Sequence, residues 1–169
     1  MQVPQLLLGL FATASAIDIY LHFDSNCGGS NSAVCTNKNP DDCCAGSTGD
    51  IFPSVGFRGI PTDWQLQCRG HSGGNCNNLR QVSPAVNTNF VCLNSGPFSG
   101  GGYSIVNGKR AEGANGGASH LPDTLLFGDG AKYNITDLEE TPLTQILTIA
   151  ASGLDSATVP EEFDVYKLE

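Results

Sequence analysis

The hydrophobic and polar positions along the chain repeat an eleven-residue pattern three times, over residues 19–29, 64–74 and 90–100. Each copy begins with an apolar residue, carries Leu or Cys two positions later, and ends in two small residues, the last of which is glycine. Apolar residues at alternate positions predict a short strand, and the glycine predicts a bend whose backbone dihedral angles other residues resist. The pattern therefore predicts three hairpins in a β-rich part of the chain.

Glycine-rich stretches follow the third copy. Residues 100–102 and 112–119 carry little apolar surface to bury and are expected to be loops. Between them, residues 103–106 predict a strand that enters a tight turn at Asn107-Gly108, since both turn residues tolerate positive φ.

The periodicity becomes helical near the C-terminus. Thr141 followed by Pro142 predicts a helix start, and Gly153 predicts its end. The residues expected on its buried face are Leu143, Ile146, Leu147 and Ala150. A second helix is predicted after Pro160, because acidic residues there favour the positive end of a helix dipole. Its expected buried residues are Phe163, Tyr166 and Leu168.

These elements predict a mostly β protein with a helical C-terminal segment, an α+β arrangement in three parts. Residues 1–16 are expected to be a signal peptide, residues 17–110 a cysteine-rich β domain, and residues 111–169 a glycine-rich linker followed by an acidic helical segment. The two C-terminal helices are expected to pack as a pair on an open face of the β part.

The first sixteen residues have the features of a secretory leader. Residues 6–11 are mostly apolar, and Ala14-Ser15-Ala16 fits the small-x-small rule of signal peptidase, although a basic start is missing. The apolar run is too short to span a bilayer as a helix. Cleavage after Ala16 predicts a secreted, extracellular protein; the alternative is a buried N-terminal strand or helix.

The cysteines are confined to the predicted β domain. They are Cys27, Cys35, Cys43, Cys44, Cys68, Cys76 and Cys92. In an exported protein this density predicts a disulfide framework, and the spacings and scattered histidines do not suit zinc. Cys43 and Cys44 are expected to have different partners, because a ring between neighbouring residues is strained. Three bridges leave one thiol, either free or available for a disulfide-linked dimer.

Charge divides the chain at the same place. Residues 17–110 carry six acidic and six basic side chains, so the net charge of −9 lies entirely in residues 111–169. A strongly acidic chain is a poor match for nucleic acid or for an anionic membrane surface, both of which attract Lys and Arg. No nucleic-acid or membrane partner is therefore expected.

Two further sites concern processing. Asn134-Ile135-Thr136 is a glycosylation sequon if the chain enters the secretory pathway. Lys109-Arg110 is either a dibasic cleavage site for a pro-protein protease or a solvated turn with two ordinary charges.

The repeated pattern resembles the hairpin motif of βγ-crystallin Greek keys. The matching segments are Trp64-Gln65-Leu66 followed by Gly74, and Val91-Cys92-Leu93 followed by Phe98-Ser99-Gly100. Residues 54–59 resemble the serine-led fourth strand that closes one Greek key. The resemblance covers about residues 17–105 and implies a disulfide-stapled Greek-key β-sandwich. The aromatic residue that precedes the glycine in the family is found in the third copy alone, and the second unit is short.

Members of that family often bind calcium. The nearest matches to the calcium motif, at residues 41–47 and 77–78, lack its full pattern, since Ala45 stands where a hydroxyl is required. No metal and no other cofactor is predicted.

The sequence contains neither an H-E-x-x-H motif nor a phosphate-binding loop. The chain is therefore expected not to be an enzyme. Arg69, His71 and Trp64 lie near one predicted hairpin and form the candidate binding patch. The alternative for these three residues is a buried Trp beside two surface polar side chains.

Three function classes remain. Leader and cysteine content resemble those of small secreted cysteine-rich proteins of fungi, including candidate effectors, which implies a non-enzymatic binding protein acting on a host or cell-wall protein or glycan. Microbial crystallin-like proteins include proteinase inhibitors and killer toxins, and residues 70–75, between Cys68 and Cys76, are the candidate inhibitory loop. The third class is a secreted hydrolase with an unrecognised site.

Overall fold

The computed structural model describes residues 16–46, 49, 51–106 and 117–169 of the 169-residue chain. The predicted leader up to residue 15, the Asn107-Gly108 turn and the Lys109-Arg110 pair lie outside the described residues. Among the residues that are described, no helix has the length and apolar character needed to cross a membrane.

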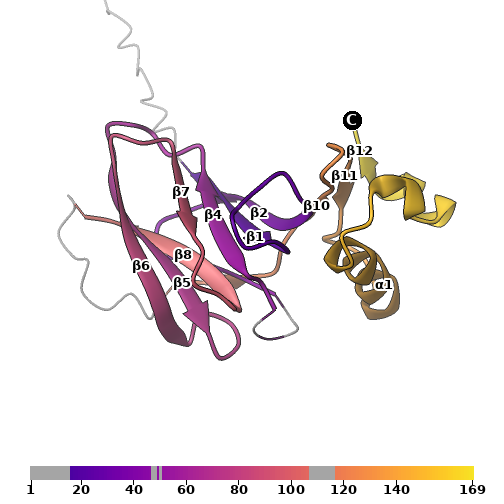
Figure 1. Cartoon of the computed structure of the whole chain (residues 1–169), viewed down its shortest axis with the longest axis horizontal. Helices are drawn as coiled ribbons and strands as arrows, with labels where there is room; N and C mark the ends of the chain where they lie inside the picture. The colour runs from indigo at the N-terminus through magenta and orange to yellow at the C-terminus, as the bar shows by residue number, and fades with distance from the viewer. Residues whose placement is uncertain (1–15, 47–48, 50, 107–116) are drawn as a thin grey trace, which may run out of the picture.

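The described strands form two sheets, so the prediction of a mostly β protein is confirmed (Figure 1). In spatial order, the first sheet is β12 (Lys167–Leu168), β11 (Lys132–Asn134), β10 (Thr124–Leu126), β2 (Ser32–Lys38), β1 (Ile17–His22), β4 (Ser54–Arg58) and β7 (Phe90–Leu93). The second is β6 (Asn78–Val86), β5 (Gln65–Ser72), β8 (Gly100–Ile105), β3 (Cys43–Ala45) and β9 (Ser119–His120). Neighbouring strands are antiparallel except β3 and β9, which are parallel.

The first eight strands form two groups of four with the same topology. In each quartet, β1–β4 and β5–β8, the first strand lies between the second and the fourth, and the third strand crosses to the other sheet. There β3 pairs with β8, and β7 pairs with β4. Two main-chain hydrogen bonds between Phe52 and Phe98, of 3.0 and 2.7 Å, join the segments that lead into β4 and β8. Each sheet therefore needs strands from both quartets.

The threefold sequence pattern resolves into two hairpins and one crossover. The first two copies correspond to the β1–β2 and β5–β6 hairpins, but the third runs from β7 in one sheet to β8 in the other. Of the terminal glycines, Gly73 and Gly74 adopt the expected positive φ, at 79° each. In the first copy it is Cys27, with φ 49°, that takes the left-handed conformation. The third predicted hairpin and two of the three predicted glycine bends are therefore wrong.

The loop predicted at residues 100–102 is also wrong, because these glycines form the first half of the buried central strand β8. A Cβ atom at Gly100 would overlap the carbonyl oxygen of Cys44. One at Gly102 would lie 2.7 Å from the carbonyl oxygen of Asp42, and one at Gly101 would lie 2.7 Å from Cγ1 of Val55. These glycines allow neighbouring strands to approach closely, and they do not form a turn.

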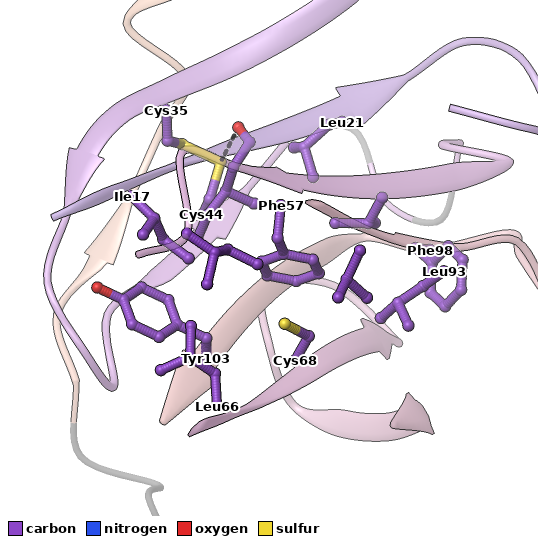
Figure 2. Packing of buried hydrophobic residues seen from close by; sticks show 14 of the residues in the cluster. Ile17, Leu21, Cys35, Cys44, Phe57, Leu66, Cys68, Leu93, Phe98 and Tyr103 are labelled. Atoms are coloured by element: carbon purple, nitrogen blue, oxygen red, sulfur yellow. Dashed lines mark hydrogen bonds between the residues drawn. A yellow bond between two sulfur atoms is a disulfide. The ribbon is translucent and has the colours of Figure 1, made fainter. Parts of the chain in front are cut away.

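Inward-facing side chains of the two sheets share one apolar core (Figure 2). Alternate residues of β1, Ile17, Ile19 and Leu21, face it and are at most 1% exposed. Tyr103 of β8 is fully buried, and its hydroxyl donates a 2.8 Å hydrogen bond to the carbonyl oxygen of Lys38. Tyr103 can therefore be buried in the core because its one polar side-chain group is hydrogen-bonded.

Three disulfides connect the described cysteines: Cys27–Cys92, Cys35–Cys44 and Cys43–Cys76. The prediction that Cys43 and Cys44 pair with different partners is confirmed. Among the described residues, the cysteine without a bridge is Cys68 of β5, which is fully buried in the core (Figure 2). Burial raises the pKa of its thiol to about 12. A dimer linked through Cys68 would require this core to open.

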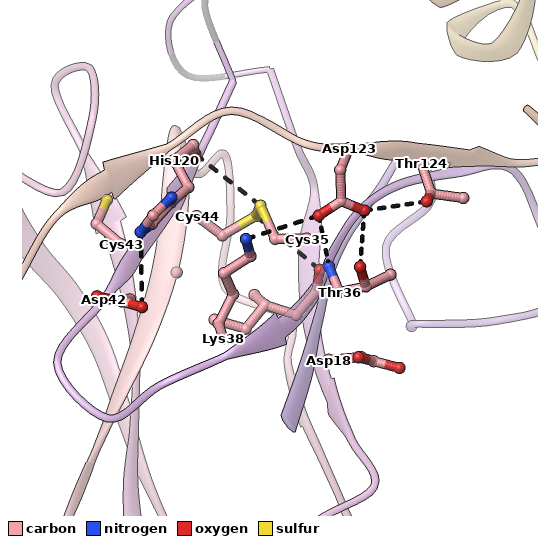
Figure 3. The surroundings of a disulfide bond; sticks show 12 residues. Asp18, Cys35, Thr36, Lys38, Asp42, Cys43, Cys44, His120, Asp123 and Thr124 are labelled. Carbon is pink, nitrogen blue, oxygen red and sulfur yellow. Dashed lines mark hydrogen bonds and ion pairs between the residues drawn. A yellow bond between two sulfur atoms is a disulfide. The ribbon is translucent and has the colours of Figure 1, made fainter. Parts of the chain in front are cut away.

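The C-terminal part of the chain completes both sheets, so the predicted separation into a β part and a helical part needs correction. Strand β9 pairs with β3, and β10 pairs with β2. The Asp123 carboxylate, just before β10, accepts hydrogen bonds from the backbone N–H and hydroxyl of Thr36 at 2.9 and 3.0 Å, and lies 3.6 Å from the Lys38 ammonium (Figure 3). This acidic side chain therefore ties the C-terminal part to β2.

One of the two predicted C-terminal helices is confirmed. Helix α1 (Glu140–Ala151) starts two residues before Pro142 with Glu139 as its N-cap, so the cap predicted at Thr141 is wrong. Ile146 and Ala150 are buried as predicted, and Gly153 follows the helix with φ 73°. The second helix is replaced by the short 3₁₀ turns η1 (Ser156–Thr158) and η2 (Glu161–Tyr166), and then β12.

The helix packs mainly on the C-terminal strands, at the end of the molecule opposite β6 and β7 (Figure 1). A second apolar cluster joins β10, β11, α1 and η2; its buried members are Leu125, Phe127, Tyr133, Ile135, Ile146, Ala150 and Phe163. Leu147 of α1 contacts both this cluster and the sandwich core. The predicted helix pair on an open face of the hairpins is therefore corrected to one helix on the extended edge of the first sheet.

Replacing Gly100 with Ala is expected to lower the free energy of unfolding by about 1–3 kcal/mol, because the added methyl group overlaps a neighbouring backbone that cannot move freely. Gly29→Ala is the matched control, since a Cβ there meets no atom within 4 Å and its φ is not positive. It should change the free energy by less than about 0.5 kcal/mol. Urea denaturation of both variants measures the difference, and equal effects would contradict the close-approach role of Gly100.

Thiol labelling tests the disulfide pairing and the burial of Cys68. The folded protein is expected not to react with a thiol reagent, whereas the chain unfolded without reductant should take up one label, at Cys68. Mass spectrometry of the labelled peptides identifies the site. More than one label per unfolded chain, or label on any cysteine other than Cys68, would show that the three bridges are not those described.

Candidate functional site

A polar cleft of about 400 Å³ opens on the outer face of the second sheet. Its lining residues are Asp41, Asp42, Cys43, Arg69, His71, Asn75, Cys76, Asn77, Gly102, Gly117 and Ser119. Leu66 and Cys68 of β5 face the core, so Arg69 and His71 of the same strand lie on the opposite face. The cleft thus brings together residues from four strands, the turn after β5 and the segments before β3 and β9.

The floor of the cleft follows from strand register. Arg69 lies opposite Gly102, Gly102 opposite Cys43, and Cys43 opposite Ser119, so these four residues form one row across the sheet. In the next row His71 lies opposite Gly100. Because β8 contributes glycines in both rows, no side chain fills the space between β5 and β3. The hollow is a consequence of the same glycines that let the strands approach.

The Cys43–Cys76 disulfide holds one wall of the cleft. It links β3 to the turn after β5, with Cα atoms 6.1 Å apart, and Sγ of Cys76 lies 3.9 Å from the carbonyl oxygen of Gly101. The same turn is held from below by the buried hydroxyl of Ser99, which donates a 2.7 Å hydrogen bond to the carbonyl oxygen of Asn75. Asn75 and Asn77 flank Cys76 and therefore stand at fixed positions over the β8 floor.

Opposite charges face each other across the cleft. Nη2 of Arg69 lies 3.3 Å from Oδ1 of Asp41, with side chains 14% and 43% exposed. Outside the lining residues, the imidazole Nε2 of His120 lies 3.5 Å from Oδ2 of Asp42, the other carboxylate of the cleft. The Asp41 carboxylate therefore orients Arg69, and the other polar groups of the cleft remain available to contact a ligand.

His71 is neutral in this environment near pH 7. Burial, and secondarily the positive charge of Arg69, lower its pKa to about 4. Among the described residues, neither Nδ1 of His71 nor Nε of Arg69 has a hydrogen-bond partner, and both atoms are buried. The cleft therefore holds a neutral imidazole beside a guanidinium, with carboxylates and amides around them.

The structure brings two of the three candidate binding residues together. Arg69 and His71 both line the cleft, whereas Trp64 does not and instead packs, partly buried, against the sandwich core. Asn134, the glycosylation candidate, is exposed on β11, where its Oδ1 accepts a 3.0 Å hydrogen bond from the backbone N–H of Thr136.

The remaining polar lining residues were not assigned to the candidate binding patch from sequence, although Asp41, Asp42 and Asn77 were weighed as calcium ligands and Asn75 lies in the candidate inhibitory loop. They are Asp41, Asp42, Asn75, Asn77 and Ser119. Asp42 adjoins Cys43, and both asparagines adjoin Cys76, so the Cys43–Cys76 pairing is the signal that would have connected them. That pairing is one of many that seven cysteines allow, and sequence spacing does not select it.

Among the described residues, no group of three or more His, Cys, Asp and Glu is placed to hold a metal ion. The candidate inhibitory loop, residues 70–75, contributes His71 and Asn75 to the cleft. Cys68 forms no disulfide, so a bridge anchors this loop on its C-terminal side alone, at Cys76.

Stability is expected to fall as the pH is lowered from about 6.5 to about 4. His71 has a pKa of about 4 in the folded state and near 6.5 when unfolded, so within this window the unfolded chain binds a proton that the folded chain does not. His22 acts in the same direction, since burial lowers its pKa to about 4 as well. Urea denaturation across the window should show a smaller pH dependence for His71→Asn than for the unsubstituted protein. An unchanged dependence would contradict the buried, neutral state of His71.

Comparison with known proteins gives one family. No curated protein and no solved structure matches the chain. A family model described as an N-terminal domain, ARB_05566_N, matches residues 18–132, which is more than half of the chain and includes the cleft and both strand quartets except Ile17. The chain therefore belongs to the ARB_05566_N N-terminal domain family.

Proposed function

We propose that this is a secreted, non-enzymatic binding protein that holds a neutral oligosaccharide in the polar cleft. The observation that carries the proposal is the convergence of hydrogen-bonding side chains from β5, β9, the β5–β6 turn and the segment before β3 over a floor of glycine. These groups are fixed by strand register and by a disulfide, so they are positioned before any ligand arrives.

The donor and acceptor set of the cleft matches the hydroxyl groups of a sugar. A hydroxyl both donates and accepts, and it is best satisfied by side chains of mixed capacity. The carboxylates of Asp41 and Asp42 accept, the guanidinium of Arg69 donates, and the amides of Asn75 and Asn77 do both. The volume of about 400 Å³ lies within the usual range of small-molecule sites.

Charge favours a neutral ligand over an acidic one. Within the cleft, the positive charge of Arg69 is compensated by Asp41 at 3.3 Å, and the buried His71 is neutral. The chain as a whole carries a net charge of −9, which repels anions at a distance. A neutral glycan of a cell wall or a host surface meets both conditions.

We also propose that the β-sandwich is a crystallin-like Greek key. A Greek key places its fourth strand beside its first. The neighbours β4 and β1, and β8 and β5, support this assignment, as does the exchange of third strands between the quartets. Further support comes from two buried serines at the same place in each quartet. The Ser54 hydroxyl donates to the carbonyl oxygen of Asp24 in the β1–β2 loop, and the Ser99 hydroxyl donates to that of Asn75 in the β5–β6 turn.

Secretion and an effector-like role are part of the proposal. Three disulfides in a small chain are typical of an oxidising compartment, which agrees with the predicted leader at residues 1–16. The general resemblance to secreted cysteine-rich fungal proteins extends the proposal to a host or cell-wall glycan as the target.

Binding to neutral oligosaccharides is expected to depend on Arg69. Soluble fragments of β-glucan, chitin and mannan test this, first in a glycan array and then by calorimetry. Arg69→Gln should weaken binding of the best fragment about tenfold, because a hydrogen bond from a charged donor is lost. Arg80→Gln is the matched control, since Arg80 is exposed on β6 and does not line the cleft.

Three outcomes would contradict the proposed function. They are the absence of binding to every neutral fragment, preferential binding of acidic fragments, and equal losses for the Arg69 and Arg80 variants. Circular dichroism and urea denaturation of both variants separate a loss of contact from a loss of fold.

A further inference from the structure

A second cavity, of about 490 Å³, lies between helix α1 and the sandwich and is lined mainly by apolar side chains. It shares no residue with the polar cleft. Ala33 of β2 and Phe52 form its buried floor, and Leu143 and Leu147 of α1 line one wall. Ile51 and Leu121 stand at its rim and are 43% and 60% exposed. Large side chains at such exposure leave apolar surface in water that a bound molecule would cover.

The floor of this apolar cavity is built from packed aromatic rings. Phe23 and Phe52 lie with ring centroids 5.4 Å apart and tilted by 48°. A Cβ atom at Gly46 would come within 2.6 Å of the Phe52 ring, so the ring can occupy its position because residue 46 is glycine. Since Phe52 is also held by its two main-chain hydrogen bonds to Phe98, the floor is fixed by both strand quartets.

The charge of the apolar cavity has one sign. Among the described residues that line it, Glu140 in the first turn of α1 is the one ionisable side chain, and it is exposed at the rim. Thr144 and Thr148 continue the same face of the helix along the wall. A ligand of this cavity would therefore meet hydrocarbon along most of its length and a single carboxylate at one end. The net charge of −9 of the whole chain acts in the same sense as Glu140.

We infer that this cavity binds an apolar small molecule that carries one amino group. The hydrocarbon part lies between α1 and the Phe52 floor, and the ammonium group pairs with the Glu140 carboxylate at the rim. Charge complementarity selects the amine over the corresponding carboxylate, and the apolar lining supplies affinity through the surface it removes from water. This site is independent of the oligosaccharide cleft, so either assignment can fail without the other.

Three probes of equal chain length, dodecylamine, dodecanol and dodecanoate, test the inference in competition with a fluorescent apolar dye, at concentrations below those at which they form micelles. The amine is expected to bind about threefold more tightly than the alcohol, as an exposed ion pair allows, and the carboxylate more weakly than either. Glu140→Gln should make the amine and the alcohol equal. Glu139→Gln removes the same charge from the neighbouring N-cap, whose side chain makes no capping hydrogen bond, and should preserve the preference.

A second pair of variants tests the location. Thr144→Trp places a large side chain in the apolar cavity and should reduce amine binding at least tenfold, whereas Gln145→Trp, at the next exposed position of the same helix, does not line the cavity and should leave binding unchanged. Failure of all three probes to displace the dye, tighter binding of the carboxylate than of the amine, or equal effects of the two Trp variants would each overturn the inference.

Discussion

The close approach of three neighbouring strands in the second sheet is the constraint on which the rest of the structure depends. Strand β8 can lie between β5 and β3 because its first three residues have no side chains, and added Cβ atoms would meet Cys44, Val55 or Asp42. On the inner side this brings Val55 of the opposite sheet onto the backbone of Gly101 and closes the core. On the outer side it leaves the hollow that Arg69, His71 and the aspartates surround.

The disulfides cross-link two strand quartets that also share strands between their sheets. Because β3 and β7 each lie in the sheet of the other quartet, neither sheet is complete without both halves of the domain. Cys35–Cys44 then links β2 in the first sheet to β3 in the second, and Cys43–Cys76 links β3 to the turn after β5. Cross-links of this kind stabilise the folded state mainly by restricting the unfolded chain. Such restriction matters most in a small domain with a modest core.

The two cavities differ in the forces that they offer. The polar cleft presents fixed donors and acceptors over a bare strand, with the charge of Arg69 compensated by Asp41. The apolar cavity at α1 presents hydrocarbon and one carboxylate, and it exists because the C-terminal segment returns to pack beside β2. The Asp123 contacts with Thr36 and Lys38 fix that return (Figure 3). An acidic side chain thus has a structural role in a segment whose charge pattern alone suggested a separate body.

Local properties of this protein were determined by its sequence, and relations between distant segments were decided by its tertiary structure. Several features follow from neighbouring residues alone. They are the strands at β1 and β5, the buried face of α1 at Ile146 and Ala150, the end of that helix at Gly153 and the separate partners of Cys43 and Cys44. Arg69 and His71 were identified because they share one strand. The Cys43–Cys76 pairing, the aspartates across the cleft and the strand at residues 100–102 did not follow, because each depends on what lies on the adjacent strand. A glycine specifies freedom of the backbone, and whether that freedom serves a turn or a close approach is decided by its neighbours in space.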